Sequence, residues 1–112
     1  FNHHNMIFNH QRITSAGTDT KTLSTAEHGS SEKLFTVERL LVSNTDSTDV
    51  TVNLWLYDGS AIVGYILKAT TVPVGTTLDV FDGVPFSYPA NNSLLLNLGD
   101  AGHTADVIFN RY

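Results

Sequence analysis

Cysteine is absent from the 112 residues of the chain. This absence excludes disulfides and thiolate metal sites within the sequence. Basic residues are scarce as well, because six Lys and Arg stand against eleven Asp and Glu and give a formal net charge of −5. Nucleic-acid-binding proteins contact phosphates through clustered Lys and Arg, so the charge balance argues against that class. No apolar run approaches the roughly 20 residues of a membrane-spanning helix, which argues against a membrane partner.

A chain of this length buries one modest hydrophobic core, and its composition shows no break between two folded units. Residues 1–33 are nevertheless distinct, because their apolar residues are isolated and follow no sustained period of 2 or 3.6. They predict an extended N-terminal arm with one short strand at residues 20–26. We expect residues 1 to about 18 to become ordered only when the arm wraps a neighbouring subunit. Residues 34–112 are expected to form the folded domain.

Residues 34–112 carry the pattern of a β protein. Val or Leu stands at every second position of residues 50–56, and Asp58-Gly59 follows as a typical two-residue hairpin turn. Further strands are expected at residues 34–44, 61–70, 76–81, 93–98 and 104–112, the last two forming a hairpin, with a proline-bearing loop at residues 85–92. About seven short strands without a helical period predict an all-β fold, a single antiparallel β-sandwich of immunoglobulin-like or jelly-roll-like type.

The Asp58-Gly59 turn also predicts the register of the central hairpin. A two-residue loop places Leu54 opposite Val63 and gives one coherent apolar face. That predicted core face consists of Val50, Val52, Leu54, Leu56, Ala61, Val63, Tyr65 and Leu67.

The opposite face of the same hairpin then carries Thr51, Asn53, Trp55, Tyr57, Ile62, Ile66 and Lys68. Trp55 would lie across from Ile62, which is a stabilising aromatic–aliphatic pair. Such a face is too apolar to be an ordinary solvated surface. Three interpretations remain open: the arm or a loop of the same chain covers it, a partner subunit covers it, or its Trp and Tyr form a ligand platform. The candidate interface residues are Trp55, Tyr57, Ile62 and Ile66.

Catalytic and metal-binding patterns are weak throughout. The histidines are His3, His4, His10, His28 and His103, and their spacing matches no zinc site, which needs three or four convergent ligands. Asp79 and Asp106 are predicted to lie on strands and to point outward into solvent, and the other aspartates suit turns. No nucleophile elbow or glycine-rich phosphate loop occurs. We therefore expect no catalytic residues, no metal, no cofactor and no enzymatic activity.

Three short segments resemble a group of small β-sandwich virion structural proteins of tailed bacteriophages, cyanophages among them. The segments are VTVNLWLYDG at residues 50–59, VPVGTTL at residues 72–78 and ADVIF at residues 105–109. The resemblance covers residues 34–112, although the loop at residues 85–92 is longer than the tight Gly-Asp turn of such proteins. It implies a protein that decorates heads or builds neck and tail parts, without catalytic residues to carry over.

The sequence therefore predicts a non-enzymatic virion structural protein, a capsid decoration or a neck or tail component. It would be made in the host cytoplasm and located in the phage particle. Its expected partners are other virion proteins and its own copies, contacted through the arm and the apolar sheet face, with no nucleic acid and no membrane. The alternative function is a carbohydrate- or receptor-binding module that uses Trp55, Tyr57 and Tyr88.

Overall fold

A computed structural model describes residues 7–14, 20–27, 33–99 and 103–112 of the chain. The described residues form nine β-strands and no helix, which confirms the predicted all-β fold. The strands are β1 (Ile7–Thr14), β2 (Lys21–Ser24), β3 (Leu34–Asn44), β4 (Val50–Tyr57), β5 (Ile62–Val72), β6 (Thr77–Asp79), β7 (Phe86–Pro89), β8 (Ser93–Leu98) and β9 (Thr104–Arg111).

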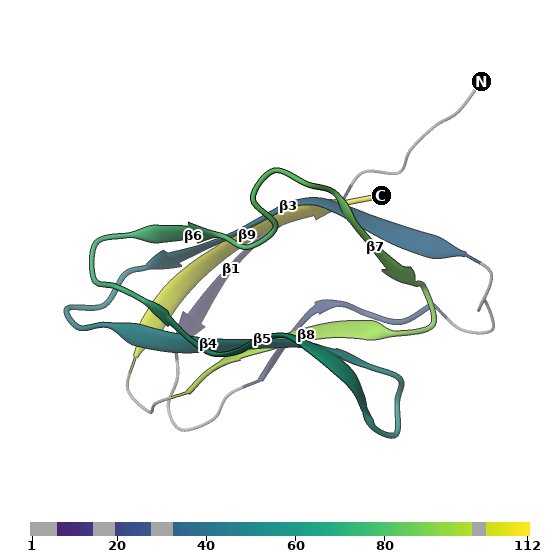
Figure 1. Cartoon of the computed structure of the whole chain (residues 1–112), viewed down its shortest axis with the longest axis horizontal. Helices are drawn as coiled ribbons and strands as arrows, with labels where there is room; N and C mark the ends of the chain where they lie inside the picture. The colour runs from purple at the N-terminus through teal and green to yellow at the C-terminus, as the bar shows by residue number, and fades with distance from the viewer. Residues whose placement is uncertain (1–6, 15–19, 28–32, 100–102) are drawn as a thin grey trace.

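The strands form two antiparallel sheets that face each other as the layers of a sandwich (Figure 1). One sheet has the order β1-β9-β3-β6, and β7 also pairs with β3 in that sheet. The second sheet has the order β2-β8-β4-β5, so β5 is one of its edge strands. In Figure 1 the far end of the β4–β5 hairpin bends away from the five-stranded sheet.

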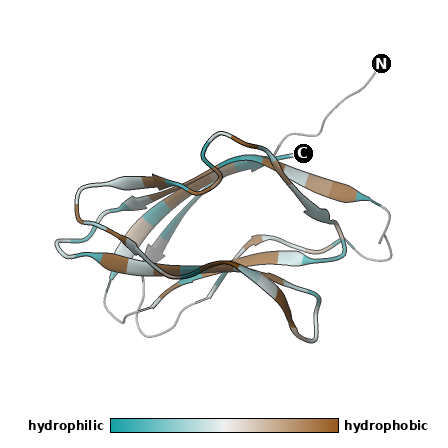
Figure 2. Ribbon diagram, in the orientation of Figure 1, coloured by the Kyte–Doolittle hydropathy of each residue, from teal (hydrophilic) through white to brown (hydrophobic). Residues whose placement is uncertain are grey.

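The core lies between the sheets and is built from alternate strand residues. In β8 the burial alternates, so that Leu94, Leu96 and Leu98 are fully buried and the residues between them are not. Figure 2 shows hydrophobic and hydrophilic bands interspersed along the strands of both layers. Complete burial of one Val or Leu side chain stabilises the fold by about 1.5–3 kcal/mol before conformational entropy is counted. The buried apolar residues are Leu23, Phe35, Val37, Leu40, Val42, Val50, Val52, Leu54, Leu56, Val72, Tyr88, Ala90, Leu94, Leu96, Leu98, Ala105, Val107 and Phe109.

Two polar groups hold the ends of this core together. Asn44 is buried, and its amide donates hydrogen bonds to the carbonyls of Thr48 and Val72 at 2.8 and 2.9 Å. At the other end, Arg111 of β9 donates to the Ser24 hydroxyl of β2 at 2.7 Å and therefore joins the two sheets.

Several strands lie where the sequence predicted them, and two were missed. The strands at residues 34–44, 50–57 and 93–98 are confirmed with the predicted bounds, and β2 lies within the strand expected at residues 20–26. Residues 7–14 were expected to be part of the extended arm outside its one short strand at residues 20–26, but they form β1 and pair with β9 along their whole length. Residues 1–6 and 15–19 of that arm lie outside the described residues. The loop expected at residues 85–92 contains β7, which pairs with the first half of β3.

The predicted register of the β4–β5 hairpin is wrong. Leu54 pairs with Leu67 instead of Val63, and the pairing shifts at three places along the hairpin. The reason lies in the turn, where the Asp58 carboxylate accepts hydrogen bonds from the amides of Ser60 and Ala61, both at 2.8 Å. These bonds stabilise a turn of Asp58–Ala61 that is longer than the expected two residues, and the bulges absorb the extra residues of β5.

The bulges change which residues of the hairpin are buried. Val63 and Tyr65 were predicted to lie in the core, but they are 54% and 45% exposed. Ala61 is exposed as well, whereas Leu67 packs partly against the core as expected.

The expected last hairpin is also wrong. Strands β8 and β9 belong to different sheets, so the chain crosses from one layer to the other between residues 98 and 104. Residues 100–102 of this connection lie outside the described residues.

Candidate interaction surface

The β4–β5 hairpin displays aromatic and aliphatic side chains on the outer face of the four-stranded sheet. Trp55 lies opposite Tyr65, and Tyr57 lies opposite Ile62. Leu54 points the other way, into the core, because successive strand residues face opposite sides. We call Trp55, Tyr57, Ile62 and Tyr65 the aromatic patch.

Three side chains that contact one another in succession, Lys68, Tyr65 and Trp55, lie within and beside this patch; we call them the stack, although the two rings are tilted by 52° to each other. The Tyr65 and Trp55 ring centroids are 5.9 Å apart, and the Lys68 ammonium nitrogen lies 4.5 Å from the Tyr65 ring centroid. A cation above an aromatic face is attracted by the ring quadrupole. Tyr65 is 45% exposed while Trp55 is only 8% exposed. Tyr65 is therefore the accessible aromatic residue of the stack, and Trp55 is its support.

The exposed apolar residues of this region are adjacent in the chain. Ile62 is 45% exposed, and its neighbour Val63 is 54% exposed. Together with Tyr65 they form the start of β5, an edge strand, so no strand of the described residues flanks them on the outer side. Figure 2 shows hydrophobic residues continuing into this bent end of the hairpin. The hairpin end therefore presents an apolar surface to solvent.

Three of the four candidate interface residues belong to the aromatic patch, and the fourth lies elsewhere. Ile66 falls at one of the shifts in pairing and packs partly against the core. Trp55 was expected opposite Ile62, but its partner on β5 is Tyr65. Sequence reasoning missed Tyr65 because it assumed a two-residue turn. The signal that could have found it is Asp58, whose side chain can bind the amides that follow it.

Tyr88 cannot take part in the alternative sugar platform. Its side chain is 1% exposed, and its ring packs edge-on against Phe35 with the centroids 5.8 Å apart. Burial raises the pKa of the Tyr88 phenol above its ordinary value. With Trp55 also largely buried, Tyr57 and Tyr65 are the two aromatic residues of the patch region that a sugar could reach.

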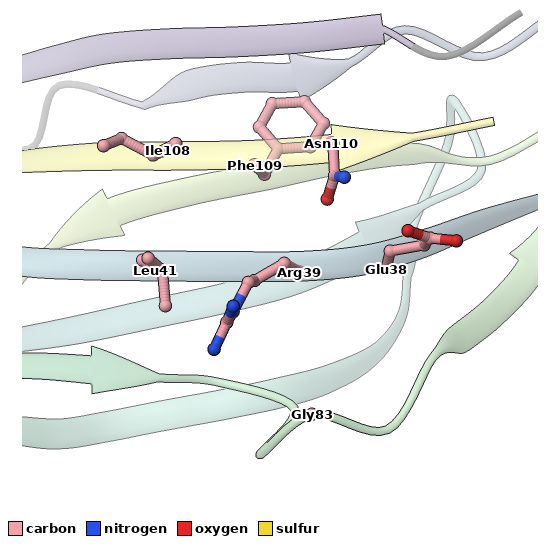
Figure 3. Close-up of a pocket in the computed structure, with 7 residues that line it drawn as sticks. All are labelled: Glu38, Arg39, Leu41, Gly83, Ile108, Phe109 and Asn110. Carbon is pink, nitrogen blue, oxygen red and sulfur yellow. The ribbon is translucent and has the colours of Figure 1, made fainter.

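A groove of about 560 Å³ lies on the outer face of the five-stranded sheet (Figure 3). Its lining residues are Glu38, Arg39, Leu41, Gly83, Ile108, Phe109 and Asn110. Arg39 and Leu41 extend from β3 toward the loop that contains Gly83. The Arg39 guanidinium already donates to the Asp79 carboxylate at 3.3 Å, so an anionic ligand would have to compete with Asp79.

The predicted outward aspartates are ion-paired. Asp106 of β9 accepts two hydrogen bonds from Arg12 of β1, at 2.8 and 3.0 Å. These hydrogen bonds lower the pKa of Asp106 below its ordinary value. Asp79 pairs with Arg39 as described above. Both carboxylates therefore tie neighbouring strands together and do not converge on a common point.

One histidine has an acidic neighbour. His103 Nδ1 lies 3.4 Å from the Asp46 carboxylate and 3.3 Å from the Thr48 hydroxyl. Burial opposes ionisation of Asp46, but hydrogen bonds from the backbone amides of Ser47 and Thr104 outweigh it and hold its pKa below the ordinary value.

The remaining histidines are not part of a cluster that the structure shows. His10 is exposed on β1, and His3, His4 and His28 lie outside the described residues. Within the described ranges, no group of three or more His, Cys, Asp or Glu residues converges as metal ligands would. The same ranges contain no helix long and apolar enough to cross a membrane.

Comparisons with known proteins identify similar folds. The chain matches no family model and no curated protein sequence. A protein of the Bacillus endospore appendages, described as a novel family of disulfide-linked pili, superposes with a TM-score of 0.50 and 15% identity over 96% of this chain and 87% of that one. The nucleoplasmin-like N-terminal domain of Drosophila FKBP39 gives a TM-score of 0.45 and 11% identity over 99% and 92% of the two chains. A protein of infectious bursal disease virus, Gx strain, gives a TM-score of 0.41 and 14% identity over 94% of this chain and 33% of that one. At these identities the likeness concerns the fold alone.

Proposed function

We propose that the chain is a non-enzymatic structural protein of a tailed-bacteriophage particle, a capsid decoration or a neck or tail component. The observation that carries the proposal is the exposed apolar stretch of Ile62, Val63 and Tyr65 at the end of the β4–β5 hairpin. Large contiguous apolar patches on soluble proteins mark interaction sites. The resemblance of residues 34–112 to virion proteins supports the phage particle as the location.

A second argument comes from the kind of protein that shares this sandwich. The Bacillus appendage protein with the similar fold is described as forming disulfide-linked pili. The present 112 residues contain no cysteine, so an assembly made by them cannot be linked by disulfides between these residues. Exposed Tyr and Ile side chains on a supported surface are suited to noncovalent contacts, because aromatic anchors dominate the energetics of many interfaces.

Docking on phage particles tests the proposal. Purified protein is mixed with particles of the phage that encodes it, assembled without it, and occupancy is measured by electron microscopy and co-sedimentation. We expect the wild-type protein to bind and the double variant Ile62→Thr with Tyr65→Thr to lose binding by about 30-fold or more, since interface anchors of this kind contribute about 2 kcal/mol or more. Ile108→Thr is the matched control, because Ile108 is 40% exposed on the other sheet.

The outcome distinguishes the proposal from its alternative. Wild-type protein that ignores particles and binds a glycan array through Tyr57 and Tyr65 would replace the structural role by a carbohydrate-binding one. Loss of docking in Ile108→Thr, with docking retained in the double variant, would show that the contact lies on the five-stranded sheet instead. Thermal unfolding of all variants checks that each one is folded, which is expected because the altered side chains are exposed.

A further inference from the structure

Two opposite charges lie at opposite ends of the aromatic patch. Asp58 stands in the turn at the tip of the hairpin, where one carboxylate oxygen accepts hydrogen bonds from the amides of Ser60 and Ala61. These bonds lower the pKa of Asp58, so the group is ionised at neutral pH. Lys68 lies further along β5, with its ammonium above the Tyr65 ring. The exposed apolar side chains of Ile62 and Tyr65 lie between the two charges.

The charge of β5 differs from that of the chain as a whole. The chain has a net charge of −5, which makes most approaches between two copies repulsive. Strand β5, residues 62–72, contains no acidic residue, and its one charged side chain is Lys68. Two copies can therefore approach through β5 without bringing acidic groups of that strand together.

A two-fold axis makes this arrangement self-complementary. In a symmetric dimer the same surface is used twice, so each residue meets the residue on the other side of the axis. An axis near Tyr65 brings the apolar centre of one hairpin onto the apolar centre of the other. The Lys68 end of one copy then faces the Asp58 end of the second copy, and the reverse pair forms at the same time.

The bulges of β5 determine which groups make the contact. Pairing between β4 and β5 shifts at three places, and bulges interrupt the regular spacing of free backbone groups along an edge strand. Such edges resist the addition of another strand. The contact therefore depends on side chains of the outer face and does not extend the sheet.

We propose that two copies of this chain form a two-fold dimer through the aromatic patch, in which Lys68 of each copy pairs with Asp58 of the other. The inference rests on the proposed function, because it uses the same surface. It deepens that function by naming a second copy of the chain as the first partner of the surface. On the particle, the patch would then act by pairing adjacent copies, which is how its loss would weaken docking.

Analytical ultracentrifugation of the free protein over a range of concentrations tests the dimer. We expect a concentration-dependent dimer, measured at one fixed ionic strength because salt screens both the Lys68–Asp58 pairs and the repulsion between two copies of net charge −5. Lys68→Glu places an acidic group opposite Asp58 twice in each dimer and is expected to weaken dimerisation about tenfold or more. Lys68→Arg keeps the charge and is expected to stay within about threefold of the wild-type protein.

Two further variants separate the specific pair from general charge. Ser60→Lys combined with Lys68→Glu exchanges the two ends of the patch and is expected to restore most of the affinity, since Ser60 is exposed beside Asp58. Lys21→Glu changes the net charge by the same two units, but on β2 at the opposite edge of the sheet, and is expected to have the smaller effect. Equal losses in Lys21→Glu and Lys68→Glu, or no rescue by the double variant, would overturn the pairing.

The two proposals fail separately. A wild-type protein that stays monomeric at the highest accessible concentration overturns the dimer, while its docking on phage particles would leave the proposed function intact. A protein that dimerises, is weakened by Lys68→Glu and never docks on phage particles would leave the dimer intact and overturn the proposed function.

Discussion

Truncation of Leu54 and of Val63 gives the sharpest test of the hairpin geometry. Leu54 is fully buried on β4, with Leu67 of β5 on one side and Leu96 of β8 on the other. Both neighbouring strands fix its surroundings, so the cavity left by Leu54→Ala cannot collapse easily. Leu→Ala substitutions at such sites reduce the free energy of unfolding by about 2–5 kcal/mol, and we expect the upper half of that range.

Val63 is the decisive comparison, because the register predicted from the sequence buries it and the register of the structure exposes it. In the two-residue turn suggested by Asp58-Gly59, Val63 would be the buried partner of Leu54, and its truncation would cost on the order of 2 kcal/mol. In the structure it lies at a shift in pairing and is 54% exposed. We therefore expect Val63→Ala to change the free energy of unfolding by no more than about 0.5 kcal/mol.

Urea unfolding followed by tryptophan fluorescence measures both variants, since Trp55 is the one tryptophan of the chain and lies next to Leu54. The transition midpoint and its slope are compared with those of the wild-type protein, and an unchanged slope shows that the native and unfolded states keep their difference in exposed surface. Equal destabilisation by the two substitutions would refute the bulged register and restore the simple hairpin.

Two further predictions concern polar groups of the fold. Asn44→Ala removes the partner of the Thr48 and Val72 carbonyls and of the Asp46 amide, so we expect the free energy of unfolding, measured in urea, to fall by about 3 kcal/mol. Arg12 lowers the pKa of Asp106, so the stability that this pair provides is complete above the unfolded pKa of about 3.9 and is lost as the pH falls through the lower folded pKa. Thermal midpoints from pH 7 to pH 2 should therefore fall less steeply in Asp106→Asn, and identical slopes would contradict this assignment.

The sandwich was predictable where local pattern and burial agree. In β4, Val50, Val52 and Leu54 alternate with outward residues, and the predicted bounds of the strand are those of the structure. The turn after β3 was predictable too, because Asn44 and Asp46 carry the short oxygen-bearing side chains that bind nearby amides. These features depend on residues close in sequence.

The missed elements depend on distant partners. Strand β1 has no clear alternation of its own, and it becomes a strand because it pairs with β9 about ninety residues later. Strand β7 is short, ends at Pro89 and exists because it pairs with Leu34–Val37, on the edge of β3 that pairs with β6 further along the strand. No local period in either segment could have indicated these pairings.

The candidate surface illustrates the same limit at the level of single residues. Trp55, Tyr57 and Ile62 were predicted from alternation and share the outer face. Ile66 was assigned to that face and Tyr65 to the core, because alternation on β5 was counted from a two-residue turn. The Asp58 side chain stabilises a longer turn, and the bulges that follow it place Tyr65 on the outer face and Ile66 against the core.

The stack of Lys68, Tyr65 and Trp55 suggests how one surface can serve both the free and the assembled protein. In the free chain the Lys68 ammonium lies over the Tyr65 ring. Trp55, next to Tyr65, is only 8% exposed even before a partner binds. Assembly needs only that Lys68 turn from the ring toward a carboxylate on a neighbour, which exchanges one modest electrostatic contact for another. The favourable free energy of association must then come from burial of the Tyr65 and Ile62 side chains. In the proposed assembly, a surface of this kind would associate reversibly and become tight only when several copies are held together.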